Sequence, residues 1–210
     1  VLGGFIGTAR AAIEGTNASL TGFFAAAATH YRALLGGTVA FVLLVFGTAV
    51  GLGLAGFVFG IGAMALATVN EVVAFAVGVG SAVIWLVSIL VVVMFVQFYD
   101  TAIVIENKSV TESLRRSIDL VRSNPKSVAG FSVVWVALLN AFLVPEYLLQ
   151  VTLTDASPVD VVPIDPGLPI AVLLPIGITL SAIGFAYLYT VYTAYYMRLT
   201  ATSPAPVESI

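Results

Sequence analysis

Four long apolar stretches constrain this chain more than any other feature, because each has the roughly 20 residues that a helix needs to cross about 30 Å of hydrocarbon. They lie at 34–60, 73–98, 128–151 and 168–194. Apolar residues make up 60% of the chain, well above the roughly 45–50% of soluble domains. The sequence therefore predicts an all-α integral membrane protein with four transmembrane helices. The first stretch stays apolar from Gly60 to Val69, which leaves open a longer tilted helix or a dipping loop.

The cations give this topology an orientation. All eight lysines and arginines fall on one side: Arg10, Arg32, Lys108, Arg115, Arg116, Arg122, Lys126 and Arg198. The positive-inside rule places both termini and the segment 99–127 in the cytoplasm, with the protein in the cell membrane. The opposite side holds an acidic external loop at 154–167 without a cation, and the tail at 200–210 is expected to be flexible.

The segment 109–123 predicts an amphipathic helix on the cytoplasmic surface. Its apolar residues recur at helical spacing: Val110, Leu114, Ile118 and Val121. We expect this stripe to lie on the membrane surface or on neighbouring helices.

The ends and the charges of this helix are also predicted by spacing. Ser109 and Glu112 fit a capping box, and Asn124-Pro125 ends the helix. Two favourable i,i+4 ion pairs are expected, Glu112 with Arg116 and Arg115 with Asp119.

The N-terminal region at 8–33 predicts a second, weaker interfacial helix before the first span. A shift of 90 residues aligns four identical pairs: Ser19 with Ser109, Thr21 with Thr111, Arg32 with Arg122, and Phe41 with Phe131. The order of a surface helix followed by two spans then occurs twice, which favours a parallel two-fold internal repeat.

Three polar residues lie close to the apolar stretches and are candidates for a polar contact or a solute pathway. Glu146 follows Pro145 inside the third span, where a carboxylate either turns toward water or marks a pathway. Asn140, in the same span, is better explained as a partner in an interhelical hydrogen bond. Asp100 ends the second span, and a wetted boundary residue is favoured there over a proton or ion site.

Glycines concentrate in the first span. Gly51 to Gly56 matches G-x-G-x-x-G, but the motif lies in a spanning helix without a preceding strand, so we reject a dinucleotide site. Small residues allow close approach of helix backbones in lipid. We therefore assign helix packing to Gly47, Gly51, Gly56 and Gly60.

Aromatic and basic residues gather at the cytoplasmic ends of the predicted helices. An aromatic belt at the headgroups is the first explanation for the tyrosines near the end of the fourth span. The predicted interfacial or lipid-headgroup residues are Arg115, Arg116, Arg122, Tyr192, Tyr195, Tyr196 and Arg198.

Composition excludes several functions. There is no cysteine and one histidine, His30, so thiolate chemistry is excluded and metal-ligand patterns are absent from the sequence. No nucleophile with a base and no pair of carboxylates stands at catalytic spacing, so we predict no enzyme, cofactor or metal. A nucleic-acid partner is not expected, because the net charge is −3 and no basic patch is present.

Residues 100–138 resemble uncharacterised multi-pass membrane proteins of halophilic archaea that are related to the membrane domain of glycerophosphodiester phosphodiesterases. The likeness is carried by Asp100, Ser109, Leu114, Arg116, Ser117, Arg122 and Asn124. It implies a fold but no catalytic residue, since the membrane domain is not the part that hydrolyses phosphodiesters.

Two functional hypotheses follow. The first is a non-enzymatic scaffold or accessory subunit that contacts membrane lipids and either other membrane subunits or a second copy of itself. The alternative is a small oligomeric transporter or channel, with Glu146, Asn140 and Asp100 lining its path.

Overall fold

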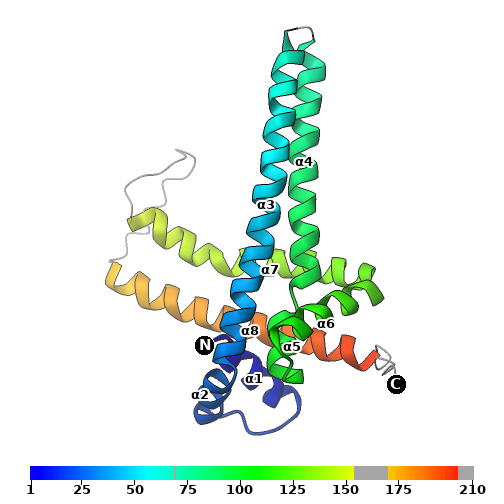
Figure 1. The fold of residues 1–210 in the computed structure, drawn as a ribbon. Coiled ribbons are helices and arrows are strands. Elements are labelled where there is room, and N and C mark those ends of the chain that lie inside the picture. The colour runs from blue at the N-terminus through cyan, green and yellow to red at the C-terminus, as the bar shows by residue number, and fades with distance from the viewer. Residues whose placement is uncertain (69, 154–169, 203–210) are drawn as a thin grey trace, which may run out of the picture. The chain divides into compact units, whose positions relative to one another are not determined.

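A computed structural model describes residues 1–68, 70–153 and 170–202, and every regular element in that part of the chain is an α-helix (Figure 1). Residues 66, 144–153 and 170–174 are described by their backbone alone. The helices are α1 (Leu2–Ile13), α2 (Leu20–Thr29), α3 (Tyr31–Ala67), α4 (Glu71–Val96), α5 (Tyr99–Glu106), α6 (Val110–Ser123), α7 (Pro125–Leu153) and α8 (Ile170–Thr202). The predicted loop at 154–167 and most of the predicted tail lie outside the described residues.

Four of the helical segments are long and apolar enough to cross a membrane: Tyr31–Ala65, Glu71–Glu106, Pro125–Leu143 and Pro175–Thr202. The protein is therefore all-helical in its described part, as predicted, with four helices of membrane-spanning length. The open question at Gly60 is answered by α3, which continues as one helix to Ala67.

The helices form two compact units. We call Ala26–Pro125 the hairpin unit, and Val1–Ala25 together with Lys126–Ile210 the aromatic unit. Each unit is described by itself below.

The hairpin unit is built on α3 and α4, which run side by side in opposite directions (Figure 1). Asn70 begins α4, since its side-chain oxygen accepts a hydrogen bond from the Val73 N–H at 3.1 Å. Halfway along, the Trp85 indole N–H donates to the Ala49 carbonyl oxygen at 3.0 Å. This bond fixes the register of the two helices, because an indole N–H needs a partner where lipid offers none.

Two short helices pack at the base of this hairpin. The predicted second span breaks after Val96, and α5 continues from Tyr99 before it ends at Asn107 in the left-handed conformation, with a φ of 52°. The amphipathic helix predicted at 109–123 is α6, and it packs against α3, α4 and α5.

The aromatic unit consists of α1, the beginning of α2, α7 and α8. The helix α1 packs along α8, and the Phe5 and Tyr189 rings stack with centroids 5.7 Å apart. Aromatic side chains also lie directly over glycine backbones, Phe23 over Gly4 and Phe142 over Gly184. Glycine is required at both positions, because an added Cβ would lie 2.7 Å or less from the ring.

The N-terminal region differs from the prediction of one interfacial helix over 8–33. It forms two helices, α1 and α2, and α3 begins at Tyr31. The break after α1 includes Gly15 at a φ of 70°, a conformation that glycine adopts without steric cost. Neither α1 nor α5 was expected from the apolar pattern, since both are shorter than a span.

Candidate functional site

A polar site of the hairpin unit lies at the base of α3 and α4, and Asp100 is its acid. This side chain is only 8% exposed, so the expectation of a wetted boundary residue was wrong. One carboxylate oxygen accepts hydrogen bonds from the Thr101 N–H at 2.7 Å and the Thr101 hydroxyl at 3.1 Å. Asp100 also lies in the first turn of α5, where the helix dipole favours a negative charge.

Tyr99 joins this site to the beginning of α3. Its hydroxyl forms a hydrogen bond with the Thr38 hydroxyl at 3.1 Å, and its ring stacks on Phe41 with centroids 5.5 Å apart. The ring also covers Gly37, where an added Cβ would lie 2.8 Å from it. Gly37, rather than the glycines predicted to pack helices, is therefore the glycine of this unit that lies closest to an opposing side chain.

Ser117 of α6 bridges the break between α4 and α5. Its hydroxyl donates to the Phe95 carbonyl oxygen at 2.8 Å and accepts from the Phe98 N–H at 3.1 Å. Ser117 is fully buried, as is Ser113 one turn earlier. The face of α6 that packs on the hairpin therefore combines two serines with Leu120 and Val121. The predicted stripe shares only Val121 with this face, and Val110, Leu114 and Ile118 are half-buried beside it.

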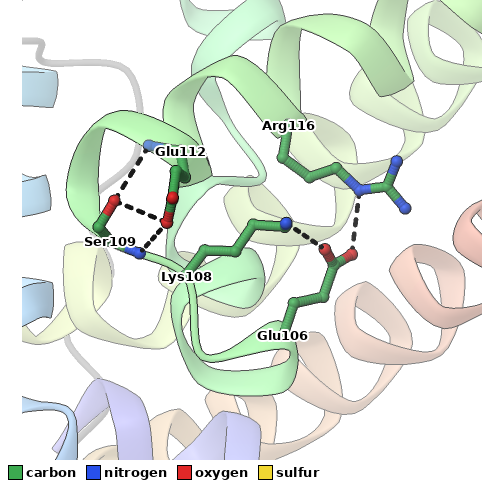
Figure 2. A network of polar contacts seen from close by, with 5 residues as sticks. All are labelled: Glu106, Lys108, Ser109, Glu112 and Arg116. Carbon is green, nitrogen blue, oxygen red and sulfur yellow. Dashed lines mark hydrogen bonds and ion pairs between the residues drawn. The ribbon is translucent and has the colours of Figure 1, made fainter. Parts of the chain in front are cut away.

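The charged residues around α6 pair differently from the prediction (Figure 2). The Glu106 carboxylate lies between two cations, with the Arg116 Nε at 3.1 Å and the Lys108 Nζ at 3.5 Å. Arg116 therefore bonds back to α5 instead of to Glu112. The sequence separation of ten residues between Glu106 and Arg116 left this pair outside the i,i+4 rule used to predict it.

Glu112 is occupied by the cap of α6, as its spacing predicted (Figure 2). The Ser109 hydroxyl and N–H both donate to its carboxylate, at 2.8 and 3.0 Å, and the Glu112 N–H donates to the Ser109 hydroxyl at 3.4 Å. The hydrogen bonds from Ser109 hold the pKa of the Glu112 carboxyl below its ordinary value.

Arg115 and Arg122 remain exposed on the outer side of α6. Asp119 lies between them in the sequence and is also exposed, yet no ion pair joins it to either arginine in the described part of the chain. The predicted Arg115 to Asp119 pair is therefore not formed.

The predicted interfacial tyrosines lie in the aromatic unit. Tyr195 stacks on Phe131 with centroids 3.9 Å apart, and its hydroxyl forms a hydrogen bond with the Ser127 hydroxyl at 2.8 Å. Tyr192 and Tyr196 are 4% and 0% exposed, so they pack inside the protein and do not reach headgroups. Arg198, in the last turns of α8, is exposed.

The two candidates in α7 are not brought together with Asp100 by any described contact. The Asn140 side-chain amide donates to the Val136 carbonyl oxygen of its own helix at 2.7 Å and is exposed, so it makes no interhelical bond among the described residues. Glu146 lies in α7, but outside the residues whose side chains are described.

The four glycines assigned to helix packing make no close approach within the chain. A Cβ added to Gly47, Gly51, Gly56 or Gly60 would meet nothing within 4 Å. Gly56 and Gly60 instead line a groove of about 330 Å³ between α3 and α4. Its other small residues include Gly53, Ala63, Gly78, Ser81 and Ala82. These four glycines therefore do not bring helices into close contact within the described part of the chain.

Among the described residues, no group of three or more histidine, aspartate or glutamate side chains is placed to hold a metal ion. The fold and these sites define a helical protein with four potential membrane spans, a polar site at the base of one hairpin and an open groove along it. Residues 1–199 match the model of a domain of unknown function, DUF7847, and the chain belongs to this family. Neither a curated protein nor a solved structure matches it.

Proposed function

We propose that this protein is a non-enzymatic accessory or scaffold subunit of a larger membrane complex. The observation that carries this proposal is the length of apolar helix in the hairpin unit. From Thr38, beside the polar site, to Ala67, α3 rises about 45 Å at 1.5 Å per residue. At the average tilt of about 20° it still spans about 42 Å, against about 30 Å of hydrocarbon.

The outer part of the hairpin is also unusually exposed. Large apolar side chains there are more than half exposed: Leu54, Phe57, Val58, Phe59, Ile61, Met64, Val72 and Phe75. An apolar surface that extends beyond the bilayer contacts water unless another protein packs against it. Large exposed apolar patches of this kind mark interaction sites. Another membrane subunit, or a second copy of this chain, packs against this surface.

The groove at 53–82 supplies a place for the partner to pack. Small residues on both of its walls allow a helix to approach closely, and this is the contact that drives association where lipid removes the hydrophobic drive. The groove lies in the same outer part of the hairpin as the exposed side chains. Length, exposure and shape thus support a partner at one place.

We further propose the finer assignments of architecture and location. The positive-inside rule supports cytoplasmic termini in a cell membrane, and the resemblance of residues 100–138 supports a haloarchaeal family related to the phosphodiesterase membrane domain.

A parallel internal repeat is supported by a contact that occurs once in each unit. In the hairpin unit, Tyr99 binds the Thr38 hydroxyl and stacks on Phe41. In the aromatic unit, Tyr195 binds the Ser127 hydroxyl and stacks on Phe131. Only Phe41 and Phe131 are related by the shift of 90 residues, while the hydroxyl partners lie 89 residues apart and the tyrosines 96.

Native mass spectrometry of protein extracted in a mild detergent tests the subunit proposal. We expect a stoichiometric partner or a second copy to be retained. The double substitution Gly56→Leu with Gly60→Leu fills the groove and should release the partner, while Gly47→Leu, outside the groove, should retain it. A strictly monomeric wild-type protein would overturn the proposal and leave steep tilt as the explanation of the long hairpin.

The alternative proposal, a small oligomeric transporter or channel, is supported by the buried carboxylate of Asp100 at the end of a potential span. It predicts that Glu146→Gln or Asp100→Asn changes a solute flux in proteoliposomes while the oligomer stays intact. Unchanged flux in both variants would remove this alternative.

A further inference from the structure

We propose that the outer face of α6 is a binding surface for the headgroups of anionic phospholipids, with Arg115 and Arg122 as its phosphate ligands. This inference rests on the lipid contact included in the proposed function and does not depend on the identity of the partner subunit.

The structure divides the cations around α6 into two groups. Lys108 and Arg116 are both paired with Glu106, and Glu112 is held by the cap at Ser109. Arg115 and Arg122 are exposed, and neither has an ion pair within the described residues. Glu106 and Glu112 therefore already have partners within the chain. The guanidinium groups of Arg115 and Arg122 remain available to an external anion.

The positions of these arginines match the requirements of an interfacial helix. Thr111, Arg115, Ile118 and Arg122 share one face, since they recur at intervals of three and four residues. The half-buried Ile118 lies between the two arginines on this face, and the half-buried Leu114 lies beside it. A helix with an apolar edge next to basic residues lies in the plane of the membrane interface.

The charge of this face selects the ligand. The four cations of the segment 106–122 outnumber its three acids, Glu106, Glu112 and Asp119, so the segment keeps a net positive charge. Guanidinium groups bind phosphate oxygens in a bidentate geometry. The two arginines are two helical turns apart, about 10 Å along the axis, so they reach neighbouring headgroups. These features fit a surface of anionic phospholipids better than a zwitterionic one.

The first test is a titration of the full-length protein in detergent with a short-chain anionic phospholipid, followed by native mass spectrometry. A basic residue near a charged bilayer contributes about a fivefold gain in affinity, so Arg115→Gln with Arg122→Gln should weaken binding by about 25-fold. The charge-matched control is Arg10→Gln with Lys108→Gln, two cations already paired with Glu14 and Glu106. The control should bind as the wild type does.

Three results would overturn the inference. They are an equal loss in both double variants, equal binding of a zwitterionic lipid by the wild type, and full competition by inorganic phosphate alone. The last result would indicate a site for free phosphate instead of a membrane surface.

A second measurement reports position and does not depend on affinity. The chain has no cysteine, so a nitroxide can be placed by Thr111→Cys on the proposed face and by Ser123→Cys away from it. In anionic nanodiscs we expect headgroup contact at residue 111 and none at residue 123. Equal contact at both positions would contradict the proposed face. Loss of lipid contact with the partner still bound would reject this inference and leave the subunit proposal standing.

Discussion

At the scale of single residues, the Ser117 side chain makes hydrogen bonds that the backbone of a continuous helix would normally make. Where α4 stops and α5 begins, its hydroxyl satisfies the Phe95 carbonyl and the Phe98 N–H at once. A buried backbone group without a partner costs free energy comparable to a lost hydrogen bond. The docking of α6 therefore stabilises the break, which ties a surface helix to the continuity of a potential span.

Replacing this side chain tests that dependence. Ser117→Ala removes the hydrogen bonds to the Phe95 carbonyl and the Phe98 N–H, and a lost buried hydrogen bond costs about 1–3 kcal/mol of unfolding free energy. We expect a clear drop in the thermal midpoint in detergent and faster hydrogen exchange in α6. Ser123→Ala is the matched control, because that exposed hydroxyl donates only to the Asp119 carbonyl of its own helix. An equal change in both variants would contradict the bridging role.

The Glu112 carboxyl group predicts how the stability of α6 depends on pH. Its pKa is lowered in the folded chain by the hydrogen bonds from Ser109, so the cap stabilises α6 fully above the unfolded pKa of about 4.3. The contribution is lost as the pH falls through the lower, folded value. An NMR titration of the Glu112 carboxyl should give a midpoint below the ordinary one. Ser109→Ala should bring it back up, and an unchanged midpoint in that variant would show that the cap is not the cause.

At the scale of elements, glycines along one helix have different roles. Gly37 lies under the Tyr99 ring, while Gly47 faces open space, although both are in α3. Their sequence contexts are similar, so only the position of the opposing helix separates them. The role of a glycine in α3 is thus decided by its neighbours in space.

Alanine substitutions at these two glycines should have opposite effects on stability. Gly37→Ala forces a methyl group to within 2.8 Å of a ring that is held by Thr38 and Phe41, and overpacking costs about 1–3 kcal/mol. Gly47→Ala should stabilise the helix by up to about 1 kcal/mol, because alanine is the better helix former. Thermal unfolding in detergent measures both. A stabilising Gly37→Ala would show that α3 and α4 do not pack as described.

At this scale the sequence predicts those features that depend on residues close together in the chain. The cap of α6 was predicted because Ser109 and Glu112 are three residues apart, and the long apolar helices because hydrophobicity alone reports them. The break after Val96 was missed, since no proline or glycine marks it and its partner, Ser117, is distant in sequence. The same distance explains why Arg116 was paired with Glu112 instead of Glu106. Long-range pairs of this kind are set by how helices dock, which periodicity does not report.

At the scale of the whole molecule, the distribution of charge is the strongest constraint on topology. Every lysine and arginine falls on one side of the four predicted spans, and five of the eight lie between Lys108 and Lys126. Moving any one span out of the membrane would divide these cations between the two sides. The four-span arrangement satisfies the positive-inside rule without exception.

Single cysteines test this arrangement directly, because the natural chain contains none and gives no background. Ser123→Cys lies between the second and third predicted spans, and Ser157→Cys lies between the third and fourth. A membrane-impermeant thiol reagent should label residue 157 from outside in intact cells and residue 123 only in inverted vesicles. Labelling of both positions from the same face would mean that α7 does not cross the bilayer. That result would overturn the four-span topology and would leave the acidic loop on the same side as the basic segment.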